Sequence, residues 1–336
     1  MQDLIKKLTD VYGPPGYEET IRDLIQAEVG PYVDAVEVDP LGNLHAVKNG
    51  SDGGQTIMLA AHMDEIGLMV TQVEEAGFVR FTNMGSLQPL NLAGTRVIFK
   101  NGAIGMINVE DAFFRPNIKA GFANLYIDLG VSSRDACPVG VGDVAAFYGP
   151  SVMLGNRVMA KSMDDRIGCA VQIETLKRLQ SSPHTVHFVF TVQEEVGVRG
   201  AKTSAFKVEP DIAIAIDVTP SGDPPGDRPF SVVLGKGPAI KVMDRGNISH
   251  PAVKDWMIET AEAHNIPYQL EVLILGGTDA AAMQVARGGS AAGCVSIPCR
   301  HTHTPSEIID LDDAENAVQL LVAMLSNQTP DALHYP

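Results

Sequence analysis

An apolar run that ends in two acids decides the fold of this chain: Thr185-Val186-His187-Phe188-Val189-Phe190-Thr191-Val192 is followed directly by Gln193-Glu194-Glu195-Val196-Gly197. A short apolar run of this kind is typical of a strand that is buried on both faces. Two carboxylates at its end are costly unless something binds them, because an unpaired buried charge is strongly disfavoured. The stretch predicts a central strand that delivers Glu194 and Glu195 either to a site of chemistry or to a solvated turn.

Similar apolar runs alternate with helical patterns through most of the sequence. Strands are expected as a pair within 33–47 and at 56–61, 185–192, 211–218, 268–273 and 291–297. Helices are expected within 1–30, interrupted at 13–16, and at 166–180, 251–264, 278–286 and 311–326. This alternation favours an α/β fold with a mostly parallel or mixed sheet sandwiched by helices.

The region 66–156 has a different pattern. Short strand-like runs such as 77–81, 96–99 and 144–148 alternate with turns rich in Gly, Asn and Pro, and no long amphipathic helix is evident. We expect a small β-rich domain at 66–156, inserted into a discontinuous α/β domain formed by 1–65 and 157–336.

Composition limits the class of protein. The 336 residues are 45% hydrophobic and 20% charged, which is enough apolar material for a sizeable core. A net charge of −16 argues against nucleic-acid binding, because phosphate recognition needs clustered Lys and Arg. The N-terminus has no signal-peptide pattern and no apolar stretch is long enough to span a membrane, so we expect a cytoplasmic protein.

The four cysteines fit buried thiols better than a nucleophilic role for one of them, which is the alternative. None has Cys-x-x-Cys spacing, so Cys137, Cys169, Cys294 and Cys299 are interpreted as buried thiols.

Acids and histidines recur where predicted strands end or a helix begins. Ligands of open α/β sheets bind beyond the carboxyl ends of the strands. The candidates at these places are His62, Asp164, Asp165, Glu194, Glu195, Asp217 and His303. Each alone could be a core histidine, a helix cap or a turn former, but their joint placement predicts one site.

Imidazole and carboxylate without thiolate form the ligand set of Zn²⁺, Co²⁺ or Mn²⁺ in hydrolytic sites. The set exceeds the three protein ligands that one catalytic metal needs, so two divalent ions per subunit are expected, with a bridging carboxylate. One acid must stay off the metals to act as general base. Glu194 and Glu195 could divide the roles of metal ligand and general base, because side chains alternate in direction along an extended chain. Asp64, two residues after His62, is expected to orient that imidazole.

Three further segments have less specific patterns. Gly276-Gly277-Thr278-Asp279 has the pattern of a loop and helix cap, although Asp279 could also shape the rim of the site. His250 precedes Pro251 as a helix-start residue would. The turn-rich loop Ser221 to Pro229 is expected to border a substrate pocket.

The chain resembles the M42 family of metallo-aminopeptidases, the glutamyl-aminopeptidase and tetrahedral-aminopeptidase group, over essentially its whole length. The segments that carry the resemblance are Ala61-His62-Met63-Asp64-Glu65-Ile66-Gly67, Ser162-Met163-Asp164-Asp165-Arg166, Val192 to Ala201, Ala215-Ile216-Asp217-Val218, Gly276-Gly277-Thr278-Asp279 and His303-Thr304-Pro305-Ser306-Glu307. Their order and context make the resemblance specific.

The resemblance implies a zinc-peptidase-like fold and a role for each ligand. His62, Asp164 and Asp217 would hold one metal, and Asp164, Glu195 and His303 the other, with Glu194 as general base and acid. It also implies that the inserted domain mediates dimerisation and that dimers assemble into a tetrahedral dodecamer. One departure concerns His301-Thr302-His303, where the family usually has an aromatic residue two positions before the last ligand, so His301 is a possible competitor of His303.

The sequence therefore predicts an aminopeptidase that acts on short peptides with a free N-terminus. A metal-dependent deacylase or carboxypeptidase-like hydrolase could use the same core, and a non-catalytic assembly protein could retain the fold. Paired carboxylates alone also suit glycan hydrolysis, which the histidines disfavour.

Overall fold

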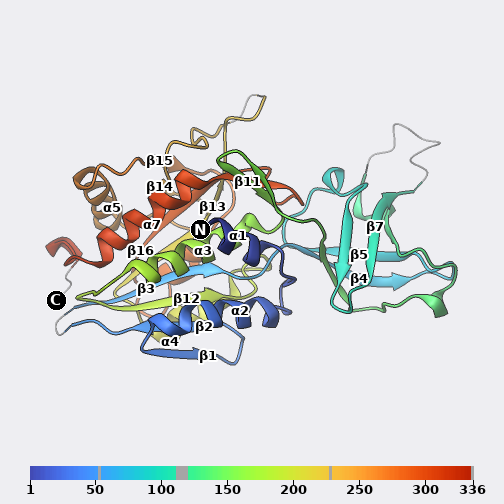
Figure 1. Cartoon of the computed structure of the whole chain (residues 1–336), viewed down its shortest axis with the longest axis horizontal. Coiled ribbons are helices and arrows are strands. Elements are labelled where there is room, and N and C mark those ends of the chain that lie inside the picture. The colour runs from blue at the N-terminus through green and yellow to red at the C-terminus, as the bar shows by residue number, and fades with distance from the viewer. Residues whose placement is uncertain (52–53, 111–119, 227–228, 334–336) are drawn as a thin grey trace.

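The molecule consists of an α/β body and a small β-barrel beside it (Figure 1). The computed structural model describes residues 1–51, 54–110, 120–226 and 229–333. The expected α/β class with a mixed sheet, helices and a small β-rich unit is confirmed.

The body contains an 11-stranded mixed sheet. Its strands are β1 (Ala35–Val38), β2 (Leu44–Lys48), β3 (Thr56–His62), β10 (Val152–Leu154), β11 (Arg157–Ala160), β12 (Thr185–Thr191), β13 (Ile212–Pro220), β14 (Ala239–Met243), β15 (Gln269–Val272), β16 (Ala291–Arg300) and β17 (Glu307–Asp310). The order is β1-β2-β12-β3-β13-β16-β17-β11-β10, and β14 joins β15 to β16. The central strands β12, β3, β13 and β16 are parallel, so their carboxyl ends lie at one edge of the sheet.

The helices cover both faces of the sheet and explain why the central strands are apolar throughout. They are α1 (Gln2–Thr9), α2 (Glu19–Val29), α3 (Met163–Arg178), α4 (Arg199–Val208), α5 (Pro251–Ala263), α6 (Asp279–Gln284) and α7 (Leu311–Leu325). On β3, Ile57 and Leu59 pack into the core under α1, α2, α3, α5 and α7, whereas Met58 and Ala60 pack under α4 and α6. Residues of both orientations are therefore buried.

The barrel has its own core and follows the chain order closely. Its strands are β4 (Gly67–Val73), β5 (Val79–Met84), β6 (Arg96–Phe99), β7 (Ile104–Val109), β8 (Leu125–Asp128) and β9 (Val144–Phe147). They close in the order β4-β5-β8-β7-β6-β9 around a separate cluster of buried side chains. β10 follows the barrel in the chain but pairs with β11, so it belongs to the large sheet.

Several details differ from the sequence-based expectations. The helix α4 and the strands β14 and β17 were not expected from the patterns, and β13 continues past Asp217 to Pro220. Cys169, Cys294 and Cys299 are buried as expected, but Cys137 is only half-buried. None of the helices in the described ranges has the length and apolar character needed to cross a membrane.

Candidate active site

The predicted site residues converge at the carboxyl edge of the parallel strands. His62 is the last residue of β3 and lies opposite Thr191 of β12, after which Glu194 and Glu195 follow. His303 lies in the turn between β16 and β17. Asp217 lies within β13 rather than at its end, because this strand is longer than its apolar run suggests.

A cavity of about 650 Å³ opens over this edge. Its lining includes the five candidate ligands and the candidate base, which are His62, Asp164, Glu194, Glu195, Asp217 and His303. Apolar side chains such as Val218, Leu273 and Leu275 form other parts of the wall. The cavity therefore combines a polar floor with space for a small ligand.

Asp164 lies at the centre of the site. Its Oδ1 is 3.0 Å from Nε2 of His62, and its Oδ2 is 3.2 Å from Nε2 of His303. The same nitrogen of His303 is 3.4 Å from Oε2 of Glu195. One carboxylate thus faces two imidazoles that come from distant parts of the chain.

The ring orientation of His62 is set by the backbone. Its Nδ1 donates a hydrogen bond to the carbonyl oxygen of Asp64 at 3.0 Å, and a carbonyl can only accept. The proton is therefore on Nδ1, and Nε2 is left to face the cavity.

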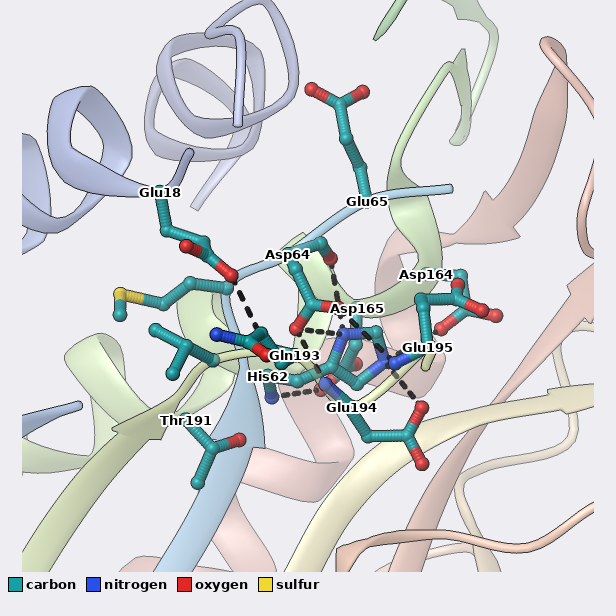
Figure 2. Close-up of polar contacts among 12 residues, drawn as sticks. Glu18, His62, Asp64, Glu65, Asp164, Asp165, Thr191, Gln193, Glu194 and Glu195 are labelled. Carbon is teal, nitrogen blue, oxygen red and sulfur yellow. Dashed lines mark hydrogen bonds and ion pairs between the residues drawn. The ribbon is translucent and has the colours of Figure 1, made fainter. Parts of the chain in front are cut away.

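The carboxylate of Asp64 lies beside the imidazole of His62 and also binds the backbone of the two glutamates (Figure 2). Its Oδ1 accepts the backbone N–H of Glu194 at 2.9 Å, and its Oδ2 accepts that of Glu195 at 3.1 Å. The distance from Oδ1 to Nδ1 of His62 is 3.6 Å, which is too long for a hydrogen bond. Asp64 therefore fixes the backbone of the two glutamates, while its carbonyl orients the imidazole.

Two groups of side chains in the described ranges could each hold a cation. In each, three ligand atoms lie within 4.8 Å of one another. One group is His62, Asp164 and Glu195, and the other is His62, Asp165 and Asp217. We call them the Asp164 half and the Asp217 half, and place His303 in the Asp164 half because of its contacts.

The electrostatics of these acids differ. Burial would raise the pKa of Asp164, but its hydrogen bonds with His303 and His62 hold that pKa below its ordinary range. Burial raises the pKa of Asp217 well above its ordinary value, and the neighbouring Asp164 adds to this. Burial likewise raises the pKa of Asp165, with Asp217 as the next contributor.

The donor set fits divalent cations. The side chain of Glu195 is only 3% exposed, and its Oε1 has no hydrogen-bond partner in the described part of the structure. Such an orphaned carboxylate oxygen is costly unless a cation or a proton meets it. Together with the raised pKa values in the Asp217 half, this favours a site built to be neutralised by metal.

The barrel also contributes to the site. Gly85 follows β5 and has a φ of +88°, and a Cβ at this position would lie 2.7 Å from Oε2 of Glu195. The adjacent Ser86 lines the cavity. The wall above Glu195 therefore comes from the barrel and requires glycine there.

Two further acids hold candidate ligands by their backbone. Asp165, one of the candidates from the sequence, accepts the backbone N–H of His62 at 3.3 Å through Oδ2. Glu307 accepts the backbone N–H groups of Asp164 and His303. Glu307 was not among the candidates from the sequence, although it ends the segment His303 to Glu307 that carries the family resemblance.

The less specific candidates are also located. Asp279 is buried rather than at the rim, and its Oδ2 accepts a hydrogen bond from Thr191 Oγ1 at 2.6 Å, while Thr278 caps α6. His301 is exposed, unlike His303. His250 is the residue before α5. Of the loop Ser221 to Pro229, positions 227–228 lie outside the described residues, and the preceding Pro220 lines the cavity.

Solved peptidase structures share this architecture over nearly the whole chain. An aminopeptidase from the archaeon Desulfurococcus kamchatkensis is 39% identical with a TM-score of 0.94, and the match covers 98% of this chain and 96% of that one. The TET1 peptidase of Pyrococcus horikoshii, described as assembling into a tetrahedron or a large octahedral shell, is 33% identical with a TM-score of 0.85, covering 96% and 98%. The fold and the site thus define a hydrolase of the aminopeptidase class.

Sequence comparison gives the family. A relative from Acetivibrio thermocellus, named only provisionally as an aminopeptidase, is 47% identical over 325 residues, which is 96% of this chain and 97% of the relative. The profile of the M42 glutamyl aminopeptidase family matches residues 42–320. The chain belongs to this family, and the resemblance predicted from its motifs is confirmed.

Proposed function

We propose that this chain is a dinuclear-metal aminopeptidase that removes the N-terminal residue of short peptides. The observation that carries the proposal is the position of Asp164, whose two oxygens face His62 and His303 on the floor of the cavity. A carboxylate between two imidazoles is suited to be shared by two cations.

The proposed ligand sets differ from the two halves, because Asp164 would be shared and Asp165 would not be a ligand. His62, Asp164 and Asp217 would hold one cation, and Asp164, Glu195 and His303 would hold the other. The donor set suits Zn²⁺ or Co²⁺, and also Mn²⁺. When bound, such cations polarise a peptide carbonyl and lower the pKa of water. Asp165 is left beside them, because its two oxygens accept the backbone N–H groups of His62 and Gly168.

Glu194 would carry the proton. It lines the cavity, and its Oε2 is 4.0 Å from Nε2 of His62. Burial raises the pKa of Glu194 well above its ordinary value, and Asp217 and Asp279 act in the same direction. An acid with a raised pKa can take a proton from the attacking water at Oε2 and return it to the leaving amine.

A peptide panel on metal-reconstituted protein tests the reaction. We expect peptides with a free N-terminus to be shortened by one residue, and the matching N-acetylated peptides to stay intact. Equal cleavage of both forms would support a deacylase instead, and release of the last residue would support a carboxypeptidase. Absence of any hydrolysis with Zn²⁺, Co²⁺ or Mn²⁺ would favour a non-catalytic assembly protein.

The assembly is a second part of the proposal. The TET1 relative is described as assembling into a tetrahedron or a large octahedral shell. We propose that the inserted barrel, β4 to β9 within 66–156, mediates dimerisation, that dimers build a dodecamer, and that the enzyme works in the cytoplasm. β7 presents Ile104 and Met106 on the outside of the barrel, which suits a contact between subunits. Sedimentation velocity should give a mass that is a multiple of 35.8 kDa, and Ile104→Lys should reduce that mass if the barrel joins the subunits.

A further inference from the structure

A buried carboxylate outside the predicted ligand set holds two candidate ligands by their backbone. Glu307 is the first residue of β17, pairs with Ala160 of β11 and is only 1% exposed. Its Oε2 accepts the N–H of Asp164 at 2.9 Å, and its Oε1 accepts the N–H of His303 at 2.7 Å. Each carboxylate oxygen of Glu307 therefore accepts one backbone N–H group.

Neither of these ligands lies in regular secondary structure at its own position. Asp164 has an extended backbone, with a ψ of 104°, at the start of α3, and His303 has a φ of 60° in the left-handed region. A non-glycine residue in the left-handed region persists only where its surroundings determine it. The hydrogen bond from the His303 N–H to Glu307 is one such determinant, and the same carboxylate holds the N–H of Asp164.

Other buried acids hold the backbone of further site residues, each at a single segment. Asp64 binds the neighbouring amides of Glu194 and Glu195, and Asp165 binds that of His62. Glu307 instead connects the start of α3 with the turn between β16 and β17. The 3.2 Å distance between Asp164 Oδ2 and His303 Nε2 therefore depends on a side chain that touches neither of these atoms.

We propose that Glu307 is a positioning residue, which fixes Asp164 and His303 relative to each other and so sets the affinity for the cation that they share. This inference rests on the metal-dependent function proposed above. A ligand pair that is held at its binding distance before the cation arrives loses less freedom on binding. Residues that orient metal ligands commonly change metal affinity by about 10- to 100-fold when they are replaced.

The test variant is Glu307→Gln. The amide keeps the size of the side chain, but its NH₂ group must face one of the two backbone N–H groups, donor to donor. We expect the metal-free variant to bind Co²⁺ and Zn²⁺ about 10- to 100-fold more weakly in one of two binding events, measured by titration calorimetry. The absorption spectrum of bound Co²⁺ should change as well, because it reports ligand geometry independently of turnover.

Asp313→Asn is the matched control. Asp313 lies in the first turn of α7, is fully buried, and accepts the N–H groups of Gly235 and Gly237 at 2.7 Å each. The substitution creates the same donor conflict, but the amides belong to no candidate ligand. We expect it to lower the melting temperature while both binding events keep their wild-type affinity.

The outcomes separate the inference from the proposed function. If Glu307→Gln binds both cations like wild type and loses only stability, as Asp313→Asn should, then Glu307 is merely structural and the inference is wrong. If the wild-type chain itself binds no divalent cation, the proposed function fails instead. Should Glu307→Gln prove too unstable to purify, Glu307→Asp gives the same comparison, because the shorter carboxylate keeps its charge but reaches only one amide.

Discussion

The two halves of the site contain similar acids but balance their charge differently. In the Asp164 half, the imidazoles of His62 and His303 lower the pKa of Asp164 in spite of its burial. In the Asp217 half, burial raises the pKa of both Asp165 and Asp217, and the charge of Asp217 adds to this at Asp165 while that of Asp164 adds to it at Asp217. The histidines thus balance the charge of Asp164, whereas Asp165 and Asp217 are left in need of a cation or protons.

Glu194 belongs to neither half, and its removal should have the largest effect on activity. Glu194→Gln should lower kcat by about 10² to 10⁴, the range of general acid–base catalysis, because the amide cannot carry the proton. Steady-state kinetics on amino-acid anilides measures this, with Glu259→Gln, an exposed residue of α5, as control. Cation content should be unchanged. Wild-type turnover of the variant would show that Glu194 is not the base.

The second-largest effect is expected on the number of bound cations, which should differ between variants of the two halves. Asp164 would be shared, so Asp164→Ala should weaken both binding events by at least about 10-fold, whereas Asp217→Ala should weaken one. Elemental analysis after gel filtration gives the number of bound ions per chain. Two retained ions in Asp164→Ala would exclude a bridging role for this carboxylate.

Neutralising each half should shift the stability of the metal-free protein in opposite directions. Asp217→Asn removes a repelling charge and should raise the free energy of unfolding, whereas Asp164→Asn removes the partner of two imidazoles and should lower it. Each change is expected to be about 1 to 3 kcal/mol, the scale for buried polar groups. Urea unfolding in the presence of a chelator measures both. Shifts of the same sign would refute the difference between the halves.

The smallest expected effect is the pH dependence of the metal-free protein, which should become less stable between pH 5 and pH 8. Burial raises the pKa of Asp279 to about 6, and burial followed by Asp64 raises that of Glu18 to about 7. Burial would lower the pKa of His303, but Glu195 and Asp164 raise it to about 12.

The signs of these shifts agree. A raised pKa favours the protonated form in the folded state, so the stability it contributes is lost as the pH rises from the unfolded-state value through the folded-state value. For Asp279 and Glu18 this window extends from about pH 4 to pH 7, and for His303 it begins near pH 6.5. Asp164 has a lowered pKa, so the stability that it contributes is fully present above the unfolded-state pKa and is the same at pH 5 and pH 8. Melting temperatures of metal-free and cation-loaded protein should therefore diverge as the pH rises, and parallel curves would contradict this.

The sequence predicted the central strands well, because burial on both faces produces apolar runs such as 56–61 and 185–192. It did not reveal α4, whose sequence Arg199–Val208 is polar on one side and starts with Arg-Gly, or the four-residue strand β17. Short elements of this kind are set by their tertiary neighbours rather than by local periodicity.

The same limit applies to the site. The acids and histidines could be found because strand ends gather at one edge of a parallel sheet. The backbone contacts of Asp64, Asp165 and Glu307 could not be found, because they join segments that only the folded chain brings together. Spacing placed the Asp64 carboxylate near His62, where it lies 3.6 Å from Nδ1, but it could not show that the Asp64 carbonyl oxygen makes the shorter contact at 3.0 Å.

The contact of Gly85 with Glu195 bears on whether the barrel is an exchangeable module. The barrel and the body have separate cores, which suggests that one could be replaced without the other. However, the barrel places a side-chain-free residue directly against a candidate ligand. A foreign insertion between β3 and β11 would therefore preserve the site only if it restored a glycine at this point, so the site is a joint product of the two units.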